Sequence, residues 1–139
     1  MRTNKSLTPD YVTGLLESAG SFTFNRGKRQ LTVVFGVRSR AANRPLVEDL
    51  RTFFGGIGRI YDTTRNTCFF RVNRPRELLR IVEHFDEHPL RGDKRNAFRI
   101  WREMVLLRAT YAGSRAPGEL NALADLLGHA RKDTSGTSA

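Results

Sequence analysis

Apolar residues recur along this chain with two different spacings. Spacing typical of one helix face marks residues 9–19, and alternation of apolar and polar residues marks residues 21–40 and 59–72. Helical patterns also lie between and after the alternating segments, at residues 45–54, from residue 75 onward, at about 93–110 and at 117–130. The sequence therefore predicts the order αββαββα, followed by additional helices.

The first predicted helix has recognisable signals at both ends. Thr8 is a favoured N-cap residue, Pro9 suits the first helical position, and Gly20 is a typical stop. One face is apolar and is expected in the core; it consists of Val12, Leu15, Leu16 and Ala19.

A second stripe on the same helix contains small and polar residues. Glycine inside a helix costs roughly 1 kcal/mol relative to alanine, but it allows another backbone to approach closely. We therefore expect an interface with another helix, supplied either by this chain or by a second molecule. The expected interface residues are Tyr11, Gly14, Leu15 and Ser18.

Both alternating segments are predicted to be β-hairpins with one apolar and one polar face. The positions expected to face the core are Phe22, Phe24, Leu31, Val33, Phe35, Val37, Ile60, Cys68, Phe70 and Val72. The fold class expected is α+β, in which a four-stranded antiparallel sheet has helices on one face only. The open face is then the polar, arginine-bearing one.

The composition limits the class of protein. With 139 residues and 39% apolar residues, the chain can bury one core, so residues 1–130 are expected to form one domain and residues 131–139 a disordered tail. No uncharged apolar run is long enough to span a bilayer. Because the N-terminus lacks a secretory pattern and Cys68 is the only cysteine, we expect an intracellular protein, cytoplasmic, nucleoid-associated or organellar. Neither a membrane nor a small-molecule substrate is expected as a partner.

The positive charge is concentrated in the middle of the chain. The 24 basic and 14 acidic residues give a net charge of +10, and residues 21–76, with twelve basic and three acidic residues, carry +9. Twenty of the basic residues are arginines, whose guanidinium groups suit bidentate contact with phosphate or guanine. A GC-rich genome would give the same arginine bias, so the position of the charge is the stronger indication of a nucleic-acid-binding surface.

Residues 12–22, VTGLLESAGSF, resemble the motif of the LAGLIDADG homing endonuclease family, in which a helix ends in an acid and a glycine before the first strand. HFDEHPL at 84–90 and KRNAFRIW at 94–101 resemble later landmarks of the family, so the likeness covers residues 8–130. The resemblance implies a saddle-shaped sheet in the DNA major groove, with the motif helix at the centre of a two-fold interface. A chain with one motif would then bind double-stranded DNA as a homodimer.

The resemblance also implies that the polar sheet face contacts DNA. The expected DNA-binding residues are Ser21, Thr23, Asn25, Arg26, Lys28, Arg29, Gln30, Thr32, Arg38, Arg40, Arg59, Tyr61, Thr63, Arg65, Thr67, Arg71 and Lys94. Lys94 matches a recurrent lysine of the family, and both phosphate contact and exposure to solvent are compatible with its position.

One residue departs from the family pattern. The resemblance implies that the last acid of the motif holds a divalent cation against the scissile phosphate, and this position is Ala19. Glu17 matches an earlier acid of the motif, but it lies about 200° away around the helix. We therefore expect no intact catalytic residue, no metal site and no cofactor, with Mg²⁺ needed only by a nuclease-active form. Ala19 is compatible with natural loss and with an engineered change.

Three functions remain open at this point. The leading one is sequence-preferring binding of double-stranded DNA by a homodimer that does not cleave. The second is a metal-dependent, site-specific endonuclease, either in an inactivated form or using another carboxylate such as Glu17. The third is an RNA-binding or splicing-assisting module; only Tyr61 and Phe69 are candidates for exposed aromatic rings, fewer than base stacking usually needs.

Other residue clusters favour structural roles. His84 and His88 are four residues apart, a spacing that can suit zinc, but no third ligand is evident. The glycines at residues 55–58 are expected to end a helix, because no Lys-Ser/Thr pair follows them. Cys68 lies on an apolar strand face and is expected to be a buried thiol.

Overall fold

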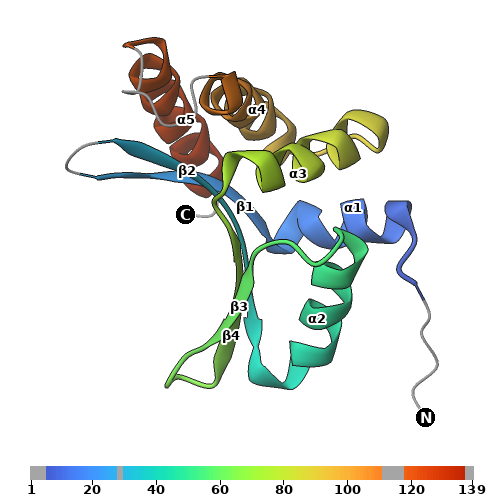
Figure 1. The fold of residues 1–139 in the computed structure, drawn as a ribbon. Helices are drawn as coiled ribbons and strands as arrows, with labels where there is room; N and C mark the ends of the chain where they lie inside the picture. The colour runs from blue at the N-terminus through green and yellow to red at the C-terminus, as the bar shows by residue number, and fades with distance from the viewer. Residues whose placement is uncertain (1–5, 28–29, 111–117, 137–139) are drawn as a thin grey trace.

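A computed structural model describes residues 6–27, 30–110 and 118–136. In chain order, its elements are α1 (Pro9–Ala19), β1 (Gly20–Arg26), β2 (Leu31–Arg40), a short 3₁₀ helix (Ala41–Asn43), α2 (Arg44–Phe53), β3 (Arg59–Asp62), β4 (Thr67–Val72), α3 (Pro75–Glu87), α4 (Lys94–Thr110) and α5 (Gly118–Gly136). This is the predicted order αββαββα with additional C-terminal helices (Figure 1).

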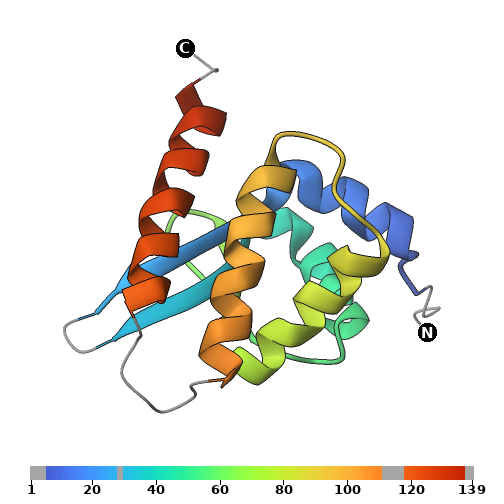
Figure 2. The same ribbon diagram turned by 90° about the horizontal axis from the view of Figure 1, so that it is seen from above.

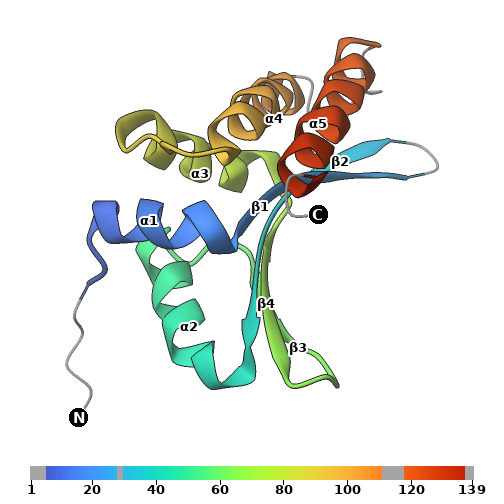
Figure 3. The ribbon, with the colours of Figure 1, turned by 180° about the vertical axis from the view of Figure 1, so that it is seen from behind.

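The four strands form one antiparallel sheet in the order β1-β2-β4-β3. The described helices lie on one side of this curved sheet, and the opposite side is open (Figures 1 and 3). The register places Phe22 opposite Phe35 and Phe35 opposite Val72, so the apolar positions of three strands meet under the helices. The α+β class expected from the sequence is confirmed.

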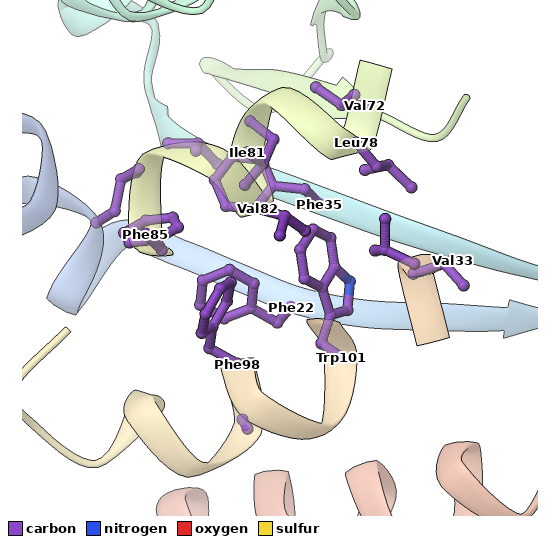
Figure 4. Close-up of a cluster of buried hydrophobic side chains, with 14 of the residues drawn as sticks. Phe22, Val33, Phe35, Val72, Leu78, Ile81, Val82, Phe85, Phe98 and Trp101 are labelled. Atoms are coloured by element: carbon purple, nitrogen blue, oxygen red, sulfur yellow. The ribbon is translucent and has the colours of Figure 1, made fainter. Parts of the chain in front are cut away.

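Aromatic side chains fill the centre of the core between the sheet and the helices (Figure 4). The ring of Phe22 lies 5.1 Å from Trp101, 5.3 Å from Phe98 and 5.5 Å from Phe85, measured between centroids. Trp101 is completely buried, and its indole Nε1 donates a hydrogen bond of 2.9 Å to the carbonyl oxygen of Val34. Because a buried indole needs such a partner, this bond fixes α4 over β2.

The first helix begins and ends as its sequence signals indicate. Thr8 is the N-cap residue, and its hydroxyl accepts a hydrogen bond of 3.2 Å from the N–H of Tyr11. Val12 and Leu16 are fully buried, so they hold one face of α1 in the core. The helix therefore has a fixed position at the start of the sheet.

The glycines after α2 end that helix, as predicted. Gly55 and Gly56 have φ angles of +89° and +81°, a region that side chains of other residues rarely adopt. Their N–H groups donate to the carbonyl oxygens of Thr52 and Arg51, both at 2.9 Å. These bonds satisfy the last turn of the helix.

His84 and His88 take part in the contact between α1 and α3. The hydroxyl of Thr13 donates a hydrogen bond of 2.8 Å to the carbonyl oxygen of His88 and lies 2.9 Å from Nε2 of His84. In the described ranges, no three His, Cys, Asp or Glu side chains are grouped so that they could hold a metal ion. Cys68 is fully buried, as predicted.

The last helix is longer than the sequence pattern predicted. α5 continues to Gly136 and so includes part of the segment 131–139 that was expected to be a tail, while residues 137–139 lie outside the described residues. The helix crosses the β1–β2 hairpin and continues past β1 (Figure 2). There Arg131 Nη1 donates a hydrogen bond of 2.6 Å to the hydroxyl of Thr23, which ties this end of α5 to the sheet. None of the helices in the described ranges combines the length and the apolar character needed to cross a membrane.

Candidate nucleic-acid interface

Strand alternation builds the open face of the sheet. Because successive residues of a strand point to opposite sides, strands that bury Phe22, Phe35 and Phe70 under the helices direct the residues between them to the open side. The open-face residues are Ser21, Thr23, Asn25, Thr32, Arg38, Arg40, Arg59, Tyr61, Thr67, Phe69 and Arg71. All of them are exposed or half-buried, so ten predicted DNA-binding residues and Phe69 share one accessible surface.

Arg71 lies in the middle of the open face. It pairs in register with Gly36 of β2 and with Arg59 of β3. With the amide of Asn25 oriented to suit its neighbours, Arg71 Nη2 donates a hydrogen bond of 3.0 Å to Asn25 Oδ1. The Nε atom of Arg71 is buried and has no hydrogen-bond partner within the described parts of the chain. Since buried donors are nearly always paired, this atom could be satisfied by an acceptor on a bound molecule.

The next row across the sheet combines an arginine with two aromatic rings. Arg38, Phe69 and Tyr61 are neighbours in the strand register. The guanidinium carbon of Arg38 lies 5.6 Å from the ring centroid of Phe69, within cation–π range. The Phe69 ring also covers Gly36, where a Cβ would lie 2.8 Å from the ring edge. This row therefore needs glycine at position 36, and it leaves Tyr61 46% exposed.

The turn between β3 and β4 continues the open face. Arg40 faces Thr67 in the register, and both the backbone and the hydroxyl groups of Thr63 and Thr67 are hydrogen-bonded to each other. The N–H of Arg65 donates to the hydroxyl of Thr63 at 3.3 Å, and the Arg65 side chain is exposed. These bonds shape a turn that presents Arg65 beyond the end of the sheet.

Two predicted DNA-binding residues lie elsewhere, and two others cannot be placed. Arg26 has the same strand parity as the core residue Phe22, so its side chain is on the helix side, where it donates to Asn121 at 3.3 Å and to Asp125 at 2.5 Å. Gln30 precedes β2, and its side-chain oxygen accepts from Arg108 of α4 at 3.4 Å. Both side chains are turned toward helices. This corrects the expectation that Gln30 lies on the polar face of the hairpin, and it places Arg26 outside the open face. Lys28 and Arg29 lie outside the described residues.

Lys94 is positioned at the C-terminal end of α1. As the first residue of α4, it donates a hydrogen bond of 3.0 Å from Nζ to the carbonyl oxygen of Ser18. Burial lowers the pKa of Lys94 from its ordinary value; the nearby Glu17 carboxylate raises it, and the guanidinium of Arg131 lowers it. The side chain is therefore half-buried against α1, rather than fully exposed to solvent.

Arg131 is a second cation at this place that the sequence patterns did not indicate. It lines the same hollow as Ala19 and Lys94, together with the residues around the junction of α1 and β1. Its position depends on the docking of α5 past β1, more than one hundred residues along the chain. No local pattern around residue 131 signals that contact.

The residues at the end of α1 do not fit a divalent cation. Ala19 offers no ligand, and the two nearest charged side chains lining the hollow, Lys94 and Arg131, are cationic. The Glu17 carboxylate instead accepts hydrogen bonds from the backbone N–H groups of Arg91 and Gly92, at 2.5 and 3.3 Å. Glu17 thus fastens the loop between α3 and α4, which argues against its use as a substitute metal ligand.

One face of α1 has no neighbour among the residues that the structure describes. Tyr11 is 49% exposed, Gly14 and Ser18 are exposed, and Leu15 is half-buried. A Cβ added at Gly14 would meet no atom within 4 Å. The four residues predicted to form a helix interface therefore share an accessible surface, and no helix in the described ranges covers Gly14.

A comparison with protein families finds one described as LAGLIDADG endonuclease, whose model matches residues 12–105. Among curated proteins, the chain is 27% identical over 111 residues to an uncharacterized 50.9 kDa protein in ND4 intron 1 of Podospora anserina. This alignment covers 73% of the chain but 24% of the relative, so the chain spans about a quarter of that protein's length.

Solved structures of homing endonucleases have the same fold. Meganuclease I-SmaMI bound to uncleaveable DNA is 25% identical with a TM-score of 0.78, and the match covers 86% of this chain and 44% of that one. I-GzeII in complex with its DNA target gives 23% identity, a TM-score of 0.72 and coverages of 86% and 41%. I-TnaI, a homing endonuclease, gives 20% identity, a TM-score of 0.77 and coverages of 93% and 99%. The family model matches well over half of the chain, and the motif helix, the strand order and the open sheet agree with it, so the chain belongs to the LAGLIDADG endonuclease family.

Proposed function

We propose that this protein binds double-stranded DNA with sequence preference, as a homodimer, through the open face of its sheet, and that it does not cleave the DNA. The observation that carries the proposal is Arg71: a buried guanidinium Nε in the middle of an uncovered, arginine-bearing face lacks an acceptor among the described residues. The oxygen and nitrogen acceptors of base edges or phosphates supply what this atom lacks.

The shape and chemistry of the open face suit the major groove. A groove about 12 Å wide admits a β-ribbon, and its base edges offer distinct patterns of donors and acceptors. Asn25, Arg38 and Arg71 carry side chains that pair with such patterns, whereas Arg40 and Arg65 lie toward the end of the surface, where phosphate contacts are expected. Two family relatives, I-SmaMI and I-GzeII, are bound to DNA in their solved structures, which supports the same partner here.

A second copy of this chain is the proposed partner of α1. The uncovered face offers Gly14 for close approach, with Tyr11 and Ser18 on either side. Two such faces related by a two-fold axis would place two open faces along one duplex. The proposed DNA site is therefore composed of two similar half-sites.

The proposed lack of cleavage is supported by the residues at the end of α1. Phosphodiester hydrolysis assisted by a metal needs ligands that hold the ion, and Ala19, Lys94 and Arg131 provide none. The remaining carboxylate, Glu17, is engaged by backbone N–H groups of the following loop. We therefore propose a binding protein with the fold of a nuclease.

Selection from a random duplex pool, followed by affinity measurement, tests this proposal. We expect a partly two-fold-symmetric selected site, and Arg71→Ala should weaken binding to it by about 1–3 kcal/mol for each half-site while relaxing the preference at one position of each half-site. Arg99→Ala is the matched control, because it removes the same charge from the helix layer, where Arg99 is exposed on α4. An equal loss of affinity for the selected duplex in Arg71→Ala and Arg99→Ala, or no enrichment of any duplex in the selection, would contradict the proposal.

The same assay compares nucleic acids. Duplex DNA, duplex RNA and single-stranded RNA of matched length are competed against the selected site. Tighter binding of single-stranded RNA would replace the DNA proposal with an RNA-binding function. We expect duplex DNA to compete best, since only Tyr61 and Phe69 offer aromatic surface on the open face.

A further inference from the structure

A groove of about 450 Å³ lies beside β3, which is an edge strand of the sheet. Residues of α2 and of the turn after it provide one wall, and Arg59, Ile60 and Tyr61 of β3 provide the other. Both elements are in the lower half of Figure 1. The groove therefore follows an edge of the sheet that pairs with β4 on one side only.

The backbone of β3 has hydrogen-bonding groups that point outward from this edge. In an antiparallel pair, every second residue bonds to the partner strand. The N–H of Thr63 donates to the carbonyl oxygen of Thr67 at 2.9 Å, and the register carries this pairing back to Tyr61. The N–H and C=O groups of Ile60 and Asp62 therefore point away from β4, and no backbone group in the described ranges bonds to them. Such an edge can pair with another strand.

The side chains that line the groove carry an excess of positive charge. They include three arginines, Arg44, Arg51 and Arg59, and one acid, Glu48, which gives a net charge of +2. Arg44 is ion-paired with Glu48 at 3.4 Å and with Asp62, whereas Arg59 is exposed and has no ion-pair partner among the described residues. This excess favours acidic side chains on a strand that binds here.

The arginines of the groove are less suited to phosphate than their number suggests. Arg51 donates hydrogen bonds from Nε and Nη2 to the carbonyl oxygens of Ile57 and Gly56, at 3.1 and 2.9 Å. Arg44 is paired with two carboxylates, which would repel a phosphate. A peptide strand also supplies the alternating donors and acceptors that the edge of β3 can pair with, and a phosphate backbone does not. These groups favour a peptide over a nucleic acid.

We propose that this groove binds an acidic segment of another protein in extended conformation, which pairs with Ile60 and Asp62 as a fifth strand of the sheet. Tyr61 is 46% exposed and offers a ring for contact with a side chain of the bound strand. A second copy of β3 is a poorer occupant, because it would bring the arginines of two grooves together. The inference does not depend on DNA binding.

The test uses the full chain and a capped, fluorescently labelled peptide of alternating glutamate and valine residues. We expect this glutamate peptide to bind, and the same peptide with lysine in place of glutamate not to bind. In the complex, NMR should show slower exchange of the amide hydrogens of Ile60 and Asp62, with little change at Tyr61, which already faces β4. No binding of the glutamate peptide, or protection confined to other parts of the chain, would overturn the inference.

A pair of variants at Asp62 tests the backbone pairing. Asp62→Pro removes the outward N–H, and Asp62→Ala is the matched control, because both variants lose the carboxylate that pairs with Arg44 and proline is tolerated where a strand N–H faces outward. Asp62→Pro should bind the glutamate peptide about fivefold more weakly than Asp62→Ala, as expected for one lost hydrogen bond. Equal affinities of the two variants would overturn the proposed pairing.

A pair of variants on α2 tests the charge of the groove without changing β3. Thr52 is exposed and lines the groove, so Thr52→Glu adds a negative charge there, and Thr52→Gln is the control of equal size. Thr52→Glu should weaken binding of the glutamate peptide about threefold or more relative to Thr52→Gln. Equal affinities would overturn the inference. A larger loss for duplex DNA than for the peptide would overturn it as well, and would assign the groove to nucleic acid.

Discussion

At the scale of single residues, Thr13 determines which ring nitrogen of the buried His84 donates a hydrogen bond. Its hydroxyl proton is donated to the carbonyl oxygen of His88, so the contact of 2.9 Å with His84 Nε2 requires the ring nitrogen to be the donor. Nε2 of His84 therefore carries a proton, and whether Nδ1 carries a second one depends on the pKa of the ring. Burial, reinforced by the neighbouring His88, lowers the pKa of His84 from 6.5 to about 4.

This shift predicts that acid destabilises the fold. Between pH 6.5 and pH 4 the unfolded chain protonates this histidine and the folded chain does not, so stability is full above pH 6.5 and falls as the pH decreases toward 4. We expect a loss of about 2 to 3 kcal/mol from this group, measured as the free energy of unfolding in urea. His84→Gln keeps a donor for Thr13 but does not titrate, so its free energy of unfolding should depend less on pH between pH 6.5 and pH 4. If the free energies of unfolding of the variant and of the unmodified protein change in parallel with pH, His84 is not the titrating group.

Three arginines of the sheet show how far the alternation of apolar and polar residues predicts the side on which a side chain lies. Arg71 and Arg38 were predicted to face the open side because each alternates with a buried neighbour, and they do. Arg26 obeys the same rule but has the parity of Phe22, which places it against Asp125 of α5. Charge alone therefore does not show which side of the sheet an arginine occupies, because strand parity decides it.

At the scale of secondary-structure elements, three parts of α1 have different surroundings: one packs in the core, one is uncovered and one contacts α4. Val12 and Leu16 anchor it in the core, while its other side, with Gly14, is uncovered. The carbonyl oxygen of Ser18, in its last turn, accepts a hydrogen bond from Lys94 at the start of α4. A change on the uncovered side can therefore be made without disturbing the other two contacts.

Gly14→Leu is expected to convert a dimer into a monomer. The added side chain enters open space within the chain, so the fold should not suffer, and leucine is the better helix former by about 0.8 kcal/mol. Across a two-fold helix contact, however, the same side chain would separate the two backbones. Sedimentation measures the mass, and Gly128→Leu is the control, because Gly128 in α5 also has no atom within 4 Å of an added Cβ. A dimer that survives Gly14→Leu would exclude this face as the interface.

Elements were predictable where the chain carries local signals, and contacts between elements were not. The bounds of α1 follow from Thr8, Pro9 and Gly20, and the end of α2 follows from its glycines. The extension of α5 to Gly136 was missed, because no breaker separates it from the polar end of the chain. The meeting of Lys94 with Arg131 depends on how α4 and α5 pack against β1, so no sequence spacing could reveal it.

At the scale of the whole molecule, most of the net positive charge belongs to the part of the chain that forms the sheet. Residues 77–139 carry ten basic and nine acidic residues, while residues 21–76 carry a charge of +9. The first group forms α3, α4 and α5 in the helix layer, and the second contains all four strands except the first residue of β1. The positive potential is therefore expected on the open side of the sheet.

This distribution predicts a steep dependence of DNA affinity on salt. Each phosphate neutralised by a basic side chain releases condensed counterions, so a dimer using several arginines per subunit should give a slope of log K against log salt steeper than about −4. Fluorescence anisotropy with the selected duplex between about 50 and 300 mM KCl measures it. Arg40→Ala removes one phosphate contact from each subunit of the proposed dimer, so it should make the slope shallower by about 2, whereas Arg99→Ala on the helix layer should not. A flat plot would leave the charge of the open face without a role.

The final prediction concerns chemistry at the centre of the proposed complex. We expect the unmodified protein to bind its selected duplex without cutting it in Mg²⁺, because Glu17 is held by Arg91 and Gly92 and Ala19 supplies no ligand. Ala19→Asp should also fail to cut, since the new carboxylate would lie in a hollow with Lys94 and Arg131 and pair with them instead of with a metal ion.

Gel analysis of labelled strands, with and without EDTA, measures both proteins, and Ala19→Asn is the control for added bulk without charge. In EDTA, Ala19→Asp should bind the duplex more weakly than Ala19→Asn, because a negative charge beside the proposed DNA surface repels the DNA phosphates. Mg²⁺-dependent, staggered cutting by Ala19→Asp would contradict this expectation and indicate a nuclease that lacks a single carboxylate. Cutting by the unmodified chain that EDTA abolishes would instead mean that Glu17 leaves its loop and serves as the ligand.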